Sequence, residues 1–234
     1  MHLGMGKVLC ASALALISDR MSAGNIVDRF AELSDIYMQY CDEMKVVPYV
    51  TSITKELVGW VERNCYPNGY WNKGHATVNF LQFILHWLTT HDISDAPMLI
   101  MCRSAIEFLN QAIEWLYRED VWLDQSTANQ IGDSGLKFLQ MYSRMVRHAF
   151  QAGEAFWGLM PKSHAVHHVF LELWEAQAAT VNPLVYSVQI SEDYIGKKSR
   201  LARRTGPQQV MSRVLQRTLI VTQQRWVAEG FLKE

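Results

Sequence analysis

The stretch PMLIMCRSAIEFLNQAIEWLYR, residues 97–118, decides the fold class because its apolar side chains recur every three or four positions. This is the period of an amphipathic α-helix with 3.6 residues per turn. Pro97 stands in the first turn, where proline is tolerated, and no glycine interrupts the run. The spacing therefore predicts a long helix over residues 96–122. The residues of its periodic face are Ile106, Leu109, Ile113, Leu116 and Tyr117.

The same period covers most of the chain. Alternating β-branched runs of strand length are nearly absent, so a sheet has little to be built from. Five of the six prolines stand where an apolar-periodic run begins. Proline is tolerated in the first turn of a helix because the backbone N–H that it lacks would have no helical partner there. We predict an all-α fold, a single compact multi-helix domain of about eight to ten helices ending in a basic helical pair. The expected helices cover residues 5–19, 24–44, 49–64, 76–90, 96–122, 127–152, 162–179, 183–190, 192–204 and 207–228.

The composition bounds the class of protein. Of the 234 residues, 49% are hydrophobic and 19% charged, which excludes a disordered, collagen-like or disulfide-scaffold protein. Four widely spaced cysteines without a C-x-x-C pair predict buried free thiols in an intracellular protein. The apolar run from Val8 to Ile17 is too short to span a bilayer, so we expect no membrane span. We predict a buried or partner-facing first helix there, with a cleaved signal segment as the alternative.

One long irregular segment, CYPNGYWNKGH at residues 65–75, interrupts the helices. Its proline and two glycines break helical regularity, and Tyr66, Tyr70 and Trp71 give it an aromatic surface. A loop of this kind either binds a ligand or is held to the core by its rings. We expect the rings to hold it to the core.

The formal net charge of −1 is a cancellation between two parts of the chain. Residues 1–196 carry 13 basic and 21 acidic side chains, a net −8, whereas residues 197–234 carry 9 basic and 2 acidic ones, a net +7. We therefore predict a helical body over residues 1–190 and a basic helical pair over residues 191–234, packed on the body. The basic side chains singled out as a binding surface are Lys197, Lys198, Arg200, Arg203, Arg204, Arg213, Arg217 and Arg225.

Two partners suit this basic surface. Cations on short helices neutralise phosphates and release counterions, the main source of non-specific affinity for nucleic acid. An acidic protein surface is the alternative, and the acidic body of this chain is one such surface. In the second helix an Arg/Gln stripe faces away from an arc expected to be buried. That arc comprises Met211, Val214, Leu215, Leu219, Thr222 and Trp226.

The connection between the two basic helices resembles that of the helix-turn-helix family. The resemblance covers residues 197–217, where Gly206 can end the first helix in a left-handed conformation. Pro207 and Ser212 depart from the family pattern, in which an apolar residue is usual. The resemblance implies a second helix that enters the major groove of DNA. The positions that match its small and apolar pattern are Leu201, Ala202, Gly206 and Leu215.

A histidine cluster at residues 164–168 is the one candidate metal site in the sequence. On a helix His164, His168 and Glu172 share a face, and imidazole and carboxylate ligands suit zinc or iron. No H-E-x-x-H or Glu-x-x-His pair accompanies them, so no general base or di-iron ligand set is identified. The alternative function is therefore a metal-dependent enzyme, or an inactive descendant of one, built on this face.

Four short motifs between Pro161 and Leu219 carry a further resemblance. They are Pro161-Lys162-x-His164-x3-His168, Asn182-Pro183, Glu192-Asp193-Tyr194-Ile195-Gly196 and Arg213-Val214-Leu215-Gln216-Arg217. In this order they resemble the C-terminal region of uncharacterised mobile-element-like proteins of protists. The resemblance covers about a quarter of the chain by motif order. It implies a nucleic-acid context and assigns no catalytic residue.

Taken together, these patterns favour a non-catalytic helical protein that contacts nucleic acid or an acidic partner. We assign no catalytic residue and expect no cofactor, with zinc or iron kept for the histidine alternative. We expect an intracellular protein, and the basic residues 197–234 are compatible with a nuclear location. A third alternative is a structural or oligomeric helical protein, because eight Trp and eleven Met can supply apolar contact surface.

Overall fold

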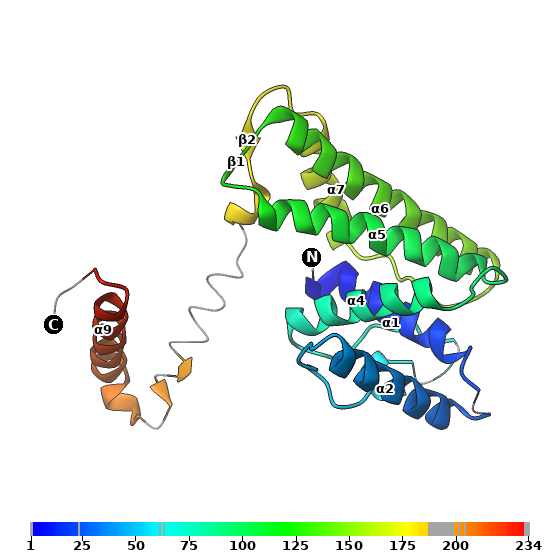
Figure 1. Cartoon of the computed structure of the whole chain (residues 1–234), viewed down its shortest axis with the longest axis horizontal. Coiled ribbons are helices and arrows are strands. Elements are labelled where there is room, and N and C mark those ends of the chain that lie inside the picture. Colours follow the sequence, from blue (N-terminus) through cyan, green and yellow to red (C-terminus); the bar gives the residue numbers. More distant parts are fainter. Residues whose placement is uncertain are drawn as a thin grey trace. The chain divides into compact units, whose positions relative to one another are not determined.

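The structure, a computed structural model, confirms the all-α prediction, with one two-stranded ladder as its only sheet among the described residues (Figure 1). The chain divides into two compact units, Met1–Asn182 and Pro183–Glu234. We treat each unit by itself. The residues described are 2–22, 24–60, 62, 64–186, 199–200, 202–203 and 205–231.

The first unit contains the long helices. Figure 1 shows α5 and α6 running side by side with α7 along them, while α1, α2 and α4 gather in the other part of the unit. The elements are η1 (His2–Gly6), α1 (Lys7–Ser18), α2 (Ile26–Glu43), α3 (Lys55–Val58), α4 (Gly74–Thr90), α5 (Pro97–Arg118), β1 (Trp122–Leu123), α6 (Gln125–Gln151), α7 (Lys162–Trp174) and β2 (Thr180–Val181). The strands pair antiparallel, with Trp122 opposite Val181 and Leu123 opposite Thr180.

Helix α1 is the centre of the core. Every residue from Val8 to Ser18 is buried except Leu16, and the helix contacts α2, α3, α4 and α5. Small side chains along it let these neighbours approach closely. The apolar run from Val8 to Ile17, predicted as a buried or partner-facing helix, is a buried core helix in the structure. In the part of the chain that the structure describes, no helix is long and apolar enough to cross a membrane.

Of residues 49–64, predicted as one helix, the described ones form only the short α3, so the prediction was wrong for them. The preceding residues Tyr49–Thr54 are rich in β-branched side chains, which disfavour helix. Ser34 Oγ accepts the N–H of Ile53 at 2.8 Å and lies 2.8 Å from the Ile53 carbonyl oxygen, which holds that residue outside a helix. Thr54 then caps α3, and Gly59 ends it with a φ of 74°.

Two glycines of α6 let α7 lie directly against it. A Cβ at position 132 would stand 2.3 Å from the backbone nitrogen of Trp174, and one at position 135 would stand 2.1 Å from the ring of Phe170. The end of α7 is fixed by Asn129, whose Nδ2 donates to the carbonyl oxygen of Trp174 at 2.7 Å. The close packing of α6 and α7 therefore depends on residues that have no side chain.

We predict that Gly132→Ala destabilises the protein by about 1–3 kcal/mol, because the backbone of α7 must move away from the new methyl group. Helix propensity alone predicts the opposite sign, a gain of about 1 kcal/mol. Denaturant unfolding measures the difference. Gly158→Ala is the control, since its Cβ would meet only the Tyr66 ring at 3.7 Å. An unchanged or raised free energy of unfolding for Gly132→Ala would contradict this packing.

The buried thiols predicted from the sequence are found at Cys10, Cys41 and Cys102, but Cys65 is exposed. Cys65 lies in the irregular loop, so the expectation of burial was wrong for it. Burial raises the pKa of the Cys10 and Cys102 thiols, which keeps them protonated and unreactive near neutral pH.

We expect the folded protein to react rapidly with a thiol reagent such as DTNB at one cysteine only, because just one thiol is accessible. The remaining three should react only when the protein is unfolded by denaturant. Cys65→Ser should abolish the rapid phase, whereas Cys41→Ser should leave it intact. A second rapid thiol in the folded protein would show that one of the buried cysteines is accessible.

The described part of the second unit comprises η2 (Pro183–Tyr186), η3 (Pro207–Gln209) and α9 (Val210–Ala228). The prediction of a helix over residues 207–228 is confirmed, with Pro207 in the first turn as expected. Of the helix predicted at 192–204, residues 199, 200 and 202 are helical, and residues 192–198, 201 and 204 lie outside the described residues.

Candidate functional site

Five of the eight predicted basic side chains belong to the described residues, and all five are exposed. Two of them precede α9 and three lie on it. Lys197, Lys198 and Arg204 lie outside the described residues. The five exposed cations are Arg200, Arg203, Arg213, Arg217 and Arg225.

A hydrogen-bonded turn joins α9 to the residues before it. Arg217 Nη1 donates to the backbone oxygen of Arg203 at 3.4 Å and to Thr205 Oγ1 at 3.3 Å. Gly206 has φ −61° and ψ 146°, so it is extended rather than left-handed, contrary to the prediction. The turn places Arg203 beside Arg217, although the two are fourteen positions apart in the sequence.

The cations differ in their partners. Among the described residues of their own unit, no carboxylate pairs with Arg200, Arg203 or Arg213. Arg225 Nε lies 2.6 Å from Glu229 Oε1, and this hydrogen bond raises the pKa of the Arg225 guanidinium. Positive charge uncompensated by described side chains is thus concentrated in the turn and the first half of α9.

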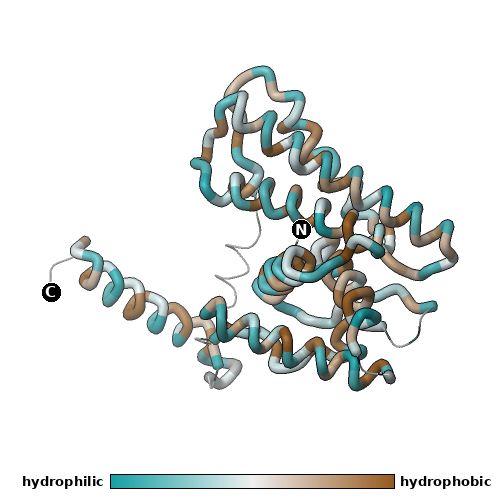
Figure 2. The backbone as a smooth tube through the Cα atoms, turned by 45° about the vertical axis from the view of Figure 1, so that its right-hand side comes forward, coloured by the Kyte–Doolittle hydropathy of each residue, from teal (hydrophilic) through white to brown (hydrophobic). Residues whose placement is uncertain are grey.

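The described residues of its own unit do not cover the apolar arc of α9, and its predicted burial on the body stays a prediction. Met211, Leu215, Leu219 and Trp226 are 87%, 60%, 61% and 49% exposed. Figure 2 shows hydrophobic and hydrophilic residues alternating along this helix, which ends near the C mark. No residue of α9 is buried, so within its own described unit the helix presents both a polar and an apolar face to its surroundings.

The structure brings two of the three predicted metal ligands together. His164 Nε2 and His168 Nε2 lie 3.0 Å apart on the exposed side of α7. Glu172 is exposed one turn further along the same helix. Across the described part of the chain, no group of three or more His, Cys, Asp and Glu side chains is placed to hold a metal. The three-ligand site therefore stays a prediction.

The aromatic loop is held to the core by one of its rings, as predicted. Trp71 is buried, its Nε1–H donates to Thr77 Oγ1 at 2.8 Å, and its ring packs edge-on against Phe80. Tyr66 and Tyr70 are exposed instead. Tyr66 joins a second group of rings around a hollow of about 460 Å³ at the end of α6. Its lining residues are Tyr66, Ser143, Val146, Arg147, Phe150, Phe156, Trp157 and Leu159.

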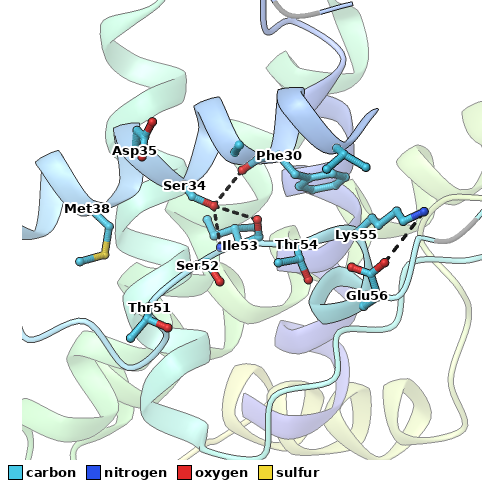
Figure 3. A pocket seen from close by; sticks show the side chains of 12 residues that line it. Phe30, Ser34, Asp35, Met38, Thr51, Ser52, Ile53, Thr54, Lys55 and Glu56 are labelled. Atoms are coloured by element: carbon cyan, nitrogen blue, oxygen red, sulfur yellow. Dashed lines mark hydrogen bonds and ion pairs between the residues drawn. The ribbon is translucent and has the colours of Figure 1, made fainter. Parts of the chain in front are cut away.

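A groove of about 390 Å³ lies between α2 and residues 51–56 (Figure 3). The hydroxyl of Ser34 lines the groove, but it is already hydrogen-bonded to the Phe30 carbonyl oxygen and the Ile53 N–H. Lys55 pairs with Glu56 at 3.9 Å on the rim. No histidine or cysteine lines the groove.

Comparisons of the chain with protein-family models, with curated proteins and with solved structures give no match.

Proposed function

We propose that this chain is a non-catalytic binding protein whose C-terminal basic segment contacts nucleic-acid phosphates. One observation carries the proposal: Arg200, Arg203 and Arg213 are exposed, and none of them pairs with a carboxylate among the described residues of its own unit. Cations gathered on one short segment repel one another, and a polyanion relieves this repulsion while its own counterions are released.

The side-chain chemistry supports phosphates as the target. Guanidinium groups form two parallel hydrogen bonds to phosphate oxygens, which ammonium groups cannot do. Gln216 and Gln224, exposed near the arginines of α9, add amide donors and acceptors that suit sugar and base edges. The hydrogen bonds from Arg217 to the preceding turn hold the two groups of cations close together.

We predict that the affinity for duplex DNA falls steeply with salt, and that Arg213→Ala lowers both the affinity at low salt and the slope. Loss of one phosphate contact should reduce the slope of log K against log salt by about 0.9. Fluorescence anisotropy with a labelled duplex, repeated with a single strand, measures both quantities.

The matched control removes two charges that already neutralise each other. Arg225→Ala combined with Glu229→Ala leaves the net charge unchanged and should leave the salt slope unchanged. A wild-type affinity that does not depend on salt would overturn the proposal. Displacement of the DNA by polyglutamate of equal charge would instead identify an acidic protein surface as the partner.

The exposed apolar face of α9 supports a second function, self-association. Apolar side chains at 60% exposure, such as Leu215 and Leu219, bury their surface when a second copy of the helix covers them. The arginine stripe lies on the other side of the helix and would stay accessible. Both functions are compatible in one protein.

Sedimentation velocity should therefore reveal a dimer or larger assembly that dissociates on dilution. We expect Leu215→Ser combined with Leu219→Ser to shift the equilibrium to the monomer, since these changes remove the apolar contact. Gln224→Ser, which lies with Arg213 and Arg217 on the polar side of the helix, is the control and should not change the equilibrium. A wild-type protein that is monomeric at all concentrations would rule out self-association.

A further inference from the structure

We propose that His164 and His168 chelate a divalent first-row transition-metal ion, with one imidazole nitrogen from each. The residues are four apart on α7, so both side chains leave the same side of the helix. Both are exposed, and their Nε2 atoms lie 3.0 Å apart. The site needs neither Glu172 nor the basic C-terminal segment.

The separation of the nitrogens fits two ligands at right angles on one ion. With metal–nitrogen distances of about 2.05 Å, two such nitrogens lie about 2.9 Å apart, whereas two ligands at the tetrahedral angle lie about 3.3 Å apart. The observed 3.0 Å is closer to the right-angled arrangement. Octahedral and square-planar ions, among them Ni²⁺ and Cu²⁺, have ligands in that arrangement.

The two Nε2 atoms share a hydrogen bond of 3.0 Å, and the positions of the two rings also fit two imidazoles bound to one ion. Two imidazoles at right angles on one ion would have centroids about 4.5 Å apart. The centroids of His164 and His168 are 4.4 Å apart, with the ring planes at 85°.

The packing of α7 leaves this side of the helix accessible. The buried side chains Phe170 and Leu173 face the core, and Phe170 lies against Gly135 of α6. His164 and His168 lie away from this contact, so their substitution removes no core packing. The remaining coordination positions of the ion are then open to water, because the described residues supply no third ligand.

The neighbouring charges set the strength of binding. The amino-terminal end of α7 and Lys162 both disfavour a cation, and no described carboxylate joins the pair. We therefore expect an affinity typical of two imidazoles, about tenfold or more above that of one imidazole because the second ligand binds intramolecularly.

Calorimetric titration of the full chain with Ni²⁺ at neutral pH tests the site. The wild type should bind one ion more tightly than the His164→Ala/His168→Ala double variant, which measures the background of the other histidines. Each single variant, His164→Ala and His168→Ala, should lose about tenfold or more in affinity. Circular dichroism verifies that all variants keep the helical content of the wild type.

His167→Ala is the matched control. The residue is exposed on the same turn, but its ring centroid lies 5.9 Å from that of His168, outside the converging pair. Its substitution should change the affinity by less than twofold. Equal losses for His167→Ala and His168→Ala, a loss from only one of the two proposed ligands, or a wild type that binds no better than the double variant would each overturn the proposal.

Discussion

Helix α1 has no polar side, so every element around it must supply an apolar surface. Its residues from Val8 to Ser18 are buried almost without interruption, and α2, α3, α4 and α5 all contact it. The hydroxyl of Ser12, which is fully buried within α1, accepts a hydrogen bond from the backbone N–H of Trp157 in the segment between α6 and α7. This one helix thereby links the amino-terminal helices to the α5–α6 pair.

The position of α7 follows from a second close contact. Gly132 and Gly135 remove the side chains that would otherwise separate α6 from α7, and Asn129 fixes the end of α7. A helix held this firmly along one side can keep the side chains of its other side at a defined spacing. The proposed chelation by His164 and His168 relies on that spacing, since a metal ion tolerates little variation in ligand geometry.

The charge of the chain is divided in the same way as its fold. Residues Met1–Asn182 carry 13 basic and 19 acidic side chains, whereas Pro183–Glu234 carries 9 basic and 4 acidic ones. The net charge of −1 therefore describes neither unit. The basic unit also exposes its apolar face, and both of its proposed activities, phosphate contact and self-association, use surfaces that its own described residues leave uncovered.

The sequence by itself determined the helices, because the 3.6-residue period and the capping residues act within a few positions of each other. The helices over residues 24–44, 76–90, 96–122 and 127–152 were predicted to within a few residues for this reason. It also determined that the chain ends in a segment rich in cations. The failure at residues 49–64 has a different origin, since Ser34 lies nineteen positions away from the Ile53 backbone that it binds.

Tertiary structure decided which surfaces are covered and which side chains meet. Periodicity identified the apolar arc of α9 but could not reveal that no part of its own unit covers it. Spacing placed three candidate ligands on one side of α7, whereas only the rotamers bring two of their nitrogens to 3.0 Å. A pattern along the chain fixes the direction in which a side chain leaves its helix. Burial and close approach depend on what other segments place opposite it.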